Sequence, residues 1–107
     1  MGIIAAARRA FETGPWPATT ATARGKLLAR LADLIATHAG ELAEIETRDT
    51  GKIIRETSAQ IAYVADYYRY YAGLADKIEG AVLPIDKPDM HVFTRREPIG
   101  VVVAIVP

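Results

Sequence analysis

A chain of 107 residues is long enough for one modest hydrophobic core, and half of its residues are apolar, which argues against disorder. Thirteen Lys and Arg residues balance thirteen Asp and Glu residues, so the charge gives no reason to expect nucleic acid or an anionic membrane as a partner. The absence of cysteine excludes disulfides, thiolate metal sites and a cysteine nucleophile within these residues. The sequence opens with no secretory signal and has no apolar stretch of membrane-spanning length, so we expect a cytoplasmic protein.

The first part of the chain is expected to be helical. Residues 5–11 are rich in Ala and Arg, which favour the helix, and Gly14 and Pro15 end this segment. Trp16 follows in a proline-flanked loop, where we expect its side chain to pack against the body of the protein.

A second helix is expected to begin after an N-cap threonine, Thr22. From Leu27 to Ile45, leucine and isoleucine recur at steps of three and four residues, which is typical of an amphipathic helix. Gly40 is expected to loosen this helix midway. Gly51 suits its end, because a helix C-terminus often needs a residue in the left-handed conformation.

A third helix is expected over residues 56–75, with two apolar or aromatic faces. Ile61, Val64, Ala65, Tyr68, Tyr71 and Ala75 form one face, and Tyr63, Tyr67 and Tyr70 form its neighbour. A helix with two such faces is usually covered on more than one side. We therefore interpret the tyrosines first as packing residues, with a ligand platform as the less favoured alternative.

The pattern then changes from helix to strand. Residues 81–85 and 90–97 are expected to form two short strands around a turn at residues 86–89, and Pro98 marks a break. Residues 99–106 are almost continuous Val and Ile, which is typical of a parallel strand buried on both faces. Such a strand needs crossover helices and neighbouring strands that the chain does not supply, so we expect a truncated piece of a larger α/β protein.

Few residues suggest catalysis or metal binding. His38 and His91 have no second ligand at metal spacing, and Ser58 belongs to no nucleophile motif. The glycines are scattered singly, so a phosphate-binding loop is absent and a self-contained enzyme is not expected. Residues 46–52 combine acidic residues, a glycine and a lysine at the end of the predicted helix, which is more suggestive of a site than the rest of the chain. A helix cap explains this combination, with Gly51 at positive φ and Lys52 facing the negative end of the helix.

Four segments together resemble the aldehyde dehydrogenase superfamily. They are residues 24–35 (RGKLLARLADLI), 46–52 (ETRDTGK), 70–80 (YYAGLADKIEG) and 94–107 (TRREPIGVVVAIVP). Each segment alone is weak evidence, but all four occur in the order and at the spacing of that family. The resemblance covers nearly the whole chain from Ala5 onward.

The resemblance implies an α/β fold that is truncated. Residues 1–78 would be the helical N-terminal part of a Rossmann-type cofactor domain, residues 79–98 the β-hairpin arm of an oligomerisation domain, and residues 99–107 the first parallel strand of the cofactor domain. The arm would add to the sheet of a neighbouring subunit, so a homo-oligomer through residues 81–97 is implied. An isolated two-stranded ribbon is only marginally stable in water, which agrees with this expectation.

The resemblance also implies NAD or NADP as cofactor and an aldehyde as substrate. In the family a cysteine thiolate adds to the aldehyde, hydride passes to the cofactor, and a carboxylate activates the water that hydrolyses the thioester. That Cys and Glu match no position here, so no catalytic residue is carried over and the chain alone is expected to be inactive. Ile105, Val106 and Pro107 match the strand end along the adenosine side of the cofactor. Asp49 matches a position that helps to bind a structural monovalent cation in some members.

Two other interpretations stay open. The chain could be a non-catalytic helical and β-arm module that pairs with aldehyde dehydrogenase subunits through residues 90–97. The exposed apolar tail at residues 101–106 argues against it, because a soluble module rarely leaves such a patch uncovered. A decayed gene remnant is the other alternative. The sequence leaves open which aldehyde is used and the choice between NAD and NADP.

Overall fold

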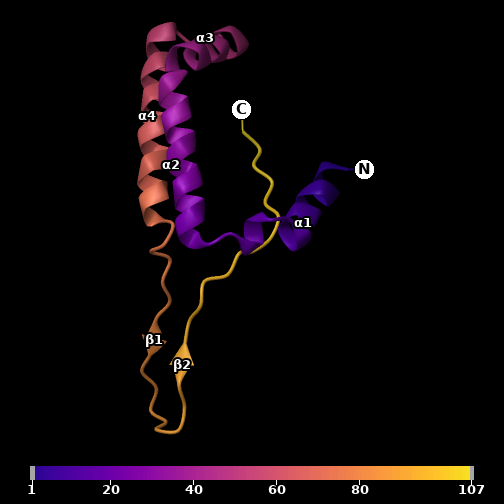
Figure 1. The fold of residues 1–107 in the computed structure, drawn as a ribbon, viewed down its shortest axis with the longest axis vertical. Helices are drawn as coiled ribbons and strands as arrows, with labels where there is room; N and C mark the ends of the chain where they lie inside the picture. Colours follow the sequence, from indigo (N-terminus) through magenta and orange to yellow (C-terminus); the bar gives the residue numbers. More distant parts are fainter. Residues whose placement is uncertain (1, 107) are drawn as a thin grey trace. The chain divides into compact units, whose positions relative to one another are not determined.

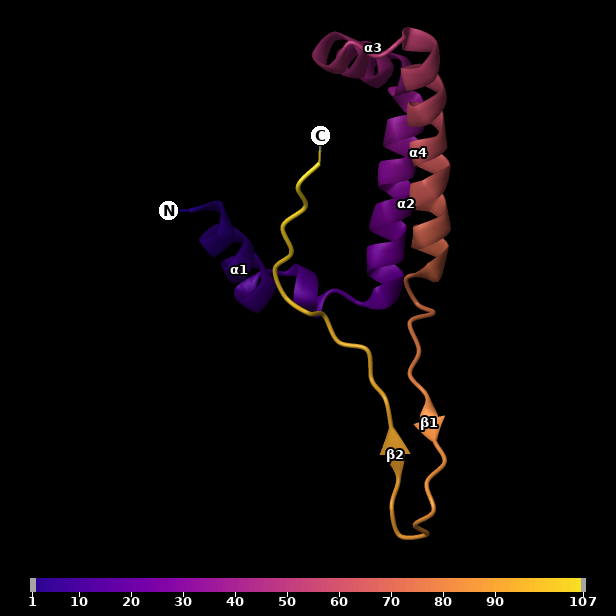
Figure 2. The ribbon, with the colours of Figure 1, turned by 180° about the vertical axis from the view of Figure 1, so that it is seen from behind.

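The computed structural model describes residues 2–106 and divides into two compact units, one of residues 20–77 and one of residues 2–19 with 78–106. The first unit is helical, with α2 (Ala21–Thr37), α3 (Ala39–Thr50) and α4 (Ile54–Leu74). In it α2 and α4 lie side by side and α3 crosses at one end (Figures 1 and 2). The second unit contains α1 (Ile3–Thr13), the 3-10 turn η1 (Trp16–Ala18) and the strands β1 (Val82–Leu83) and β2 (Val92–Phe93).

Helix α2 begins earlier than the sequence predicts. Its N-cap is Thr20, whose extended backbone precedes the helix and whose hydroxyl accepts a hydrogen bond from the Ala23 amide at 3.2 Å. The prediction of Thr22 as the cap is wrong, because Thr22 lies inside the first turn of α2. Both threonines carry a hydroxyl that can cap a helix, and with the earlier one as the cap the helix is two residues longer.

The predicted single helix up to Gly51 is broken at His38, so that prediction is wrong as well. His38 leaves the helical conformation at φ −102° and ψ 17°, and it ends α2 while preceding α3. Its amide still donates to the Leu34 carbonyl at 3.0 Å, and its carbonyl accepts from the Leu42 amide at 3.0 Å. Gly40, the expected weak point, lies inside the first turn of α3. The break therefore preserves backbone hydrogen bonding on both sides.

Small side chains form the buried centre of the helical unit. Gly25, Ala32, Ala43, Thr57 and Ala65 are the buried positions of α2, α3 and α4. At Gly25 the approach is so close that a Cβ atom would lie 2.8 Å from the Ala72 carbonyl oxygen of α4. Several of the longer leucines remain partly exposed, with 51% at Leu27, 39% at Leu31 and 49% at Leu34. Close backbone contact, more than large side chains, joins α2 to α4.

Helix α4 confirms the predicted third helix to within two residues at each end. Of the five tyrosines, Tyr68 is the least exposed, and the other four are 45% to 67% exposed. The expectation that all five pack is therefore wrong within the described chain. Helices α2 and α3 cover one side of α4 and leave the tyrosine face open.

In the second unit, α1 confirms the predicted N-terminal helix and extends it in both directions, to Ile3–Thr13. Trp16 opens the turn η1, and its side chain is 50% exposed. The expectation that Trp16 packs against the body of the protein is wrong, because this short proline-rich turn holds the ring at the surface of the described residues.

The two predicted strands form an antiparallel hairpin, but each is only two residues long. Val82 pairs with Phe93 and Leu83 with Val92. Next to them the Thr94 amide donates to the Ala81 carbonyl at 2.8 Å, and the Ala81 amide donates to Thr94 Oγ1 at 2.9 Å. Regular pairing stops there, since a ribbon of two strands has no third strand or covering helix to extend it.

Residues 99–106 form no strand, although the sequence predicts one. A strand is defined by hydrogen bonds to a neighbour, and none of the described residues pairs with this segment. Its apolar side chains are exposed, with Ile99 at 93% and Ile105 at 92%. Across residues 2–106, no helix combines the length and the apolar character needed to cross a membrane.

Candidate functional site

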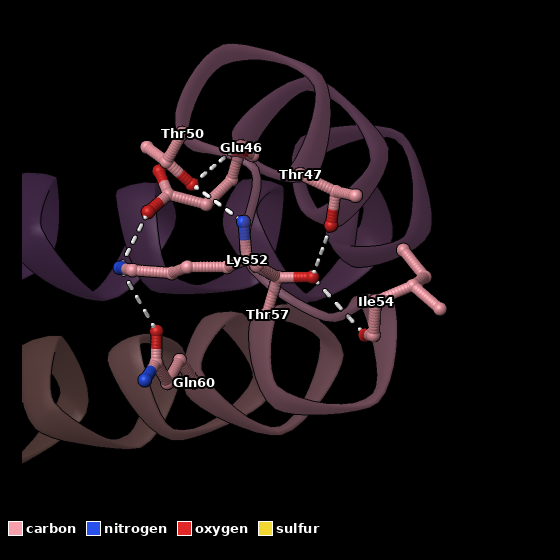
Figure 3. A network of polar contacts seen from close by, with 7 residues as sticks. All are labelled: Glu46, Thr47, Thr50, Lys52, Ile54, Thr57 and Gln60. Carbon is pink, nitrogen blue, oxygen red and sulfur yellow. Dashed lines mark hydrogen bonds and ion pairs between the residues drawn. The ribbon is translucent and has the colours of Figure 1, made fainter.

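The junction between α3 and α4 holds a network of polar contacts (Figure 3). Gly51 ends α3 in the left-handed conformation at φ 76°, and its amide donates to the Thr47 carbonyl at 2.9 Å. Lys52 follows, and its Nζ lies 2.8 Å from Glu46 Oε1 and 3.4 Å from Gln60 Oε1. The lysine thus connects the last turns of α3 to the second turn of α4. The predicted positive φ of Gly51 is confirmed, whereas the contacts of Lys52 are with two side chains.

Thr50 supports the same junction from the helix end. Its hydroxyl donates to the Glu46 carbonyl at 2.7 Å and accepts from the Lys52 amide at 3.3 Å. The second of these contacts gives a hydrogen-bond partner to the first amide beyond the cap residue Gly51. The backbone leaving α3 is therefore fixed by side chains of α3 itself.

Two threonines join α3 to α4 beneath this network. Thr57 has no exposed surface, and its hydroxyl donates to the Ile54 carbonyl at 3.0 Å. A hydroxyl has one proton, so the second contact, 2.8 Å to the Thr47 hydroxyl, has Thr47 as the donor. The described residues contain no buried side-chain polar atom without a hydrogen-bond partner.

This junction has the chemistry of a structural clamp. Its one cationic group, Lys52, is paired with Glu46, and the remaining groups are hydroxyls and an amide that bond to one another. Asp49 is exposed near the end of α3 and is not among the residues of this network. Among residues 2–106, His, Cys, Asp and Glu side chains form no group of three that could hold a metal ion. A cation site at Asp49 stays a prediction.

The predicted cofactor contacts lie at the other end of the chain. Ile105 and Val106 are extended and exposed, at 92% and 77%. Pro107 lies outside the described residues. The two described residues bring only apolar side chains and backbone groups, so their place beside a cofactor also stays a prediction.

A second cluster of chemically active side chains lies on α4. Tyr63, Asp66, Tyr67, Tyr70 and Tyr71 line an open pocket of about 350 Å³. The Tyr67 and Tyr71 hydroxyls share a hydrogen bond of 3.3 Å. That bond is the main cause of a raised pKa at Tyr71, followed by the charge of Tyr67 when it is ionised.

Arg69 lies beside this pocket between two carboxylates. Its Nη2 contacts Asp33 Oδ1 of α2 at 3.1 Å, and its Nη1 contacts Asp66 Oδ1 of α4 at 2.9 Å. Hydrogen bonds to Asp33 first and to Asp66 second raise the pKa of the Arg69 guanidinium, which keeps it charged. The bridge to Asp33 connects the two long helices.

The sequence analysis missed the residues that connect helices. Thr57, Gln60 and Arg69 have no motif around them, and their partners lie elsewhere in the sequence. A weak signal exists for Arg69, since Asp66 stands three residues before it on the same helix face. For the Thr47 and Thr57 pair, spaced ten residues apart across a helix junction, no such local signal exists.

Comparison with known proteins identifies the family. The model of the aldehyde dehydrogenase family matches residues 2–107, so the chain belongs to that family. A (Z)-2-((N-methylformamido)methylene)-5-hydroxybutyrolactone dehydrogenase from Acinetobacter baylyi is 64% identical over 104 residues, which is 97% of this chain and 21% of the relative.

Solved structures agree with this assignment. A crystal structure from Burkholderia cenocepacia, from a protein assigned to the aldehyde dehydrogenases, matches with a TM-score of 0.81 and 46% identity over 89% of this chain and 20% of its own. Betaine aldehyde dehydrogenase from Staphylococcus aureus, solved with NAD+, matches with a TM-score of 0.74 and 44% identity over 82% and 18%. The chain therefore spans about a fifth of the length of the relatives it matches.

Proposed function

We propose that this chain is part of an enzyme that oxidises aldehydes to carboxylic acids with NAD+ or NADP+. The supporting observation is the family match over residues 2–107, together with relatives that are dehydrogenases. In this proposal residues 1–78 are the helical start of the cofactor domain, residues 79–98 are the oligomerisation arm, and residues 99–107 are the first parallel strand. The exposed Val and Ile side chains of that last segment support its burial in a sheet.

The cofactor is proposed to lie along Ile105, Val106 and Pro107. Bound NAD(P)+ supplies the acceptor for the hydride that leaves the substrate. The exposed apolar side chains of Ile105 and Val106 fit a wall beside an adenosine ring, and they carry no group that could bind phosphate. These residues therefore position the cofactor by apolar contact and backbone groups. Replacing Val106 with Asp in the full-length protein should weaken NAD+ binding, measured by calorimetry.

Asp49 is proposed to contribute one ligand to a structural monovalent cation. Its exposed carboxylate is close to the end of α3, where backbone carbonyls face outward and add oxygen donors. In the full-length protein, Asp49→Asn should reduce the dependence of thermal stability on K+ or Na+. If the thermal stability of the variant depends on K+ and Na+ as that of the unchanged protein does, Asp49 is not a ligand of such a cation.

A polypeptide of these 107 residues is proposed to lack dehydrogenase activity. It contains no cysteine, and the proposed reaction proceeds through a cysteine thiolate. The test is NADH formation by the purified polypeptide with a panel of aldehydes, with the full-length protein as positive control. Activity of the short polypeptide would refute this proposal, and an inactive full-length protein would refute the proposed enzyme function.

The hairpin is proposed to join the subunits of the enzyme. In the alternative function, the chain is a non-catalytic module that associates with other subunits through the same hairpin. Donors alternate along an antiparallel strand, and Thr94 donates inward to Ala81. The Phe93 amide therefore points away from β1 and is free to pair with a partner strand. The Phe93 side chain is 62% exposed, which adds apolar surface to that edge.

Phe93→Pro tests this edge. Proline removes the outward donor, so the subunit assembly should weaken, as measured by light scattering after size-exclusion chromatography. Val92→Pro removes an inward donor and is the control that breaks the hairpin itself. If Phe93→Pro leaves the mass of the assembly unchanged, the edge of β2 is not the interface.

A further inference from the structure

The base of the hairpin is closed by a side chain of its second strand. In a regular antiparallel ladder, Ala81 and Thr94 would form a hydrogen-bonded pair, in which each backbone amide donates to the carbonyl of the other residue. One of these two bonds is present, since the Thr94 amide donates to the Ala81 carbonyl at 2.8 Å. The Ala81 amide donates instead to the Thr94 hydroxyl oxygen Oγ1 at 2.9 Å. The Thr94 side chain therefore replaces its own carbonyl as the acceptor.

The displaced Thr94 carbonyl lies against Gly80, the residue before Ala81. A Cβ atom at Gly80 would overlap that carbonyl oxygen, so only glycine fits this approach without a shift of the backbone. Beyond Gly80 and Thr94, none of the described residues continues the pairing of the two strands. The hydroxyl contact and the close approach at glycine thus end the ladder at this pair.

A single bond at the base matters because the ladder above it is very short. Two residue pairs join the strands there, Val82 with Phe93 and Leu83 with Val92. A two-stranded ribbon is marginally stable in water, so we expect a hairpin of this length to open and close. Loss of one hydrogen bond should then lower the ratio of closed to open hairpin by about three- to ten-fold.

We propose that Thr94 is a positioning residue for subunit association, because its hydroxyl holds the hairpin closed and β2 in place. This inference rests on the proposed function of the hairpin as the arm that joins subunits. Since the backbone groups of Ala81 and Thr94 face each other, the amide and carbonyl of Phe93 point outward from β2. They stay aligned for a partner strand only while β2 is held to β1. Opening of the hairpin lowers the apparent affinity in proportion to the closed fraction.

The experiment compares two replacements of Thr94 in the full-length protein. Thr94→Val keeps the branched shape that suits a strand and removes the hydroxyl, so the Ala81 amide loses its acceptor. The dissociation constant of the subunits, measured by light scattering over a concentration series, should rise about three- to ten-fold. Thr94→Ser keeps the hydroxyl and loses the branch, and it should associate nearly as tightly as the unchanged protein.

Hydrogen–deuterium exchange tests the hydrogen bond itself. Mass spectrometry of peptides that contain residue 81, in protein dilute enough for the subunits to separate, should show faster exchange in Thr94→Val. Thr94→Ser should return the exchange to the slower rate. Thr13→Val is the matched control, because it removes a threonine hydroxyl that donates to the Arg9 carbonyl within α1. This control should change neither the exchange at residue 81 nor the association.

Three outcomes would overturn the inference. If Thr94→Val associates as tightly as the unchanged protein while Phe93→Pro weakens the assembly, the hairpin is the interface but Thr94 does not position it. If Thr94→Ser weakens association as much as Thr94→Val does, the branched shape of the side chain matters and the hydroxyl does not. If neither Thr94→Val nor Phe93→Pro changes the assembly, the proposed role of the hairpin in joining subunits fails together with this inference.

Discussion

Thr57 is a polar residue whose side chain has no contact with water, and two hydrogen bonds compensate for its burial. Each bond leads to a different neighbour, the Ile54 carbonyl on its own helix and the Thr47 hydroxyl on α3. A buried hydroxyl without partners would cost free energy, so this position requires both of them.

Replacing Thr57 with valine keeps the shape and removes the hydroxyl. The Thr47 hydroxyl then loses its acceptor in a partly buried position, so the free energy of unfolding should fall by about 1–2 kcal/mol. Urea denaturation measures this change. Ser58→Ala, at the exposed neighbouring position, is the control and should change stability little. Equal effects of both substitutions would contradict the role given to the buried pair.

The hydroxyl of Tyr71 makes a contribution to stability that depends on pH. Its pKa is raised above the ordinary 10.0, mainly by the hydrogen bond with Tyr67. The folded state therefore holds this proton more tightly than the unfolded state. Any stability that Tyr71 contributes is present below the unfolded pKa and is lost as pH rises through the folded pKa.

Tyr67→Phe removes the hydrogen bond and should lower the pKa of Tyr71 toward its ordinary value. Titration followed by the NMR signal of the ring carbon that carries the hydroxyl reports Tyr71 individually. Tyr68→Phe leaves the hydrogen-bonded pair intact and should not change the titration. A Tyr71 midpoint that stays the same in Tyr67→Phe would mean that another neighbour causes the shift.

At the scale of elements, Gly25 determines how closely α2 and α4 approach. An added Cβ would lie 2.8 Å from the Ala72 carbonyl oxygen and 3.3 Å from the Ala75 Cβ, and the first of these atoms belongs to the backbone. The neighbouring helix can yield only by moving away. The resulting loss of close contact would affect the whole length over which the two helices pack.

Gly25→Ala should therefore destabilise the protein by about 1–3 kcal/mol, as overpacking does in other cores. Gly73→Ala is the matched control, because it makes the same change in a helix where an added Cβ meets no atom within 4 Å. Alanine favours the helix over glycine by about 1 kcal/mol, so this control should be neutral or stabilising. Thermal unfolding of both variants, followed by circular dichroism, measures the contrast.

Local rules predicted the elements whose determinants are close in sequence. Helix α4 follows from its periodic apolar residues, and the end of α3 follows from Gly51, which takes the required positive φ. The break at His38 was not predictable, because no proline or glycine occupies that position and the hydrogen bonds pass around it. The lengths of β1 and β2 and the contact of Asp33 with Arg69 depend on residues far away in sequence.

In the candidate site, too, the features with local determinants were predictable and those that depend on distant residues were not. The cap at Gly51 was predictable because its determinants, the end of the apolar periodicity and a glycine that can take positive φ, lie within a few residues of one another. The open tyrosine pocket was not, because helical spacing places aromatic rings on one face without telling which face a neighbour covers. Only the packing of α2 and α3 against the other side of α4 exposes these rings.

At the scale of the whole molecule, the apolar segment at residues 99–106 has neither a covering element nor a paired strand among the described residues. Ile99, Val102, Val103, Ile105 and Val106 are between 66% and 93% exposed. The segment is extended, and none of the described residues pairs with its backbone. Apolar surface and free backbone groups together are the properties of a strand edge that recruits another chain.

We therefore expect a polypeptide of these 107 residues to self-associate through this segment. Replacing Val103 and Ile105 together with lysine should increase the monomer fraction, because charge interrupts both the apolar contact and the pairing of edges. Light scattering over a concentration series measures that fraction. The matched control replaces Ile3 and Ile4 with lysine, which adds the same charge at apolar side chains of 90% and 67% exposure. These two residues are in a helix whose backbone hydrogen bonds are internal, so α1 offers no edge to pair. An equal rise of the monomer fraction in both variants would show that net charge, and not the segment at 99–106, controls association.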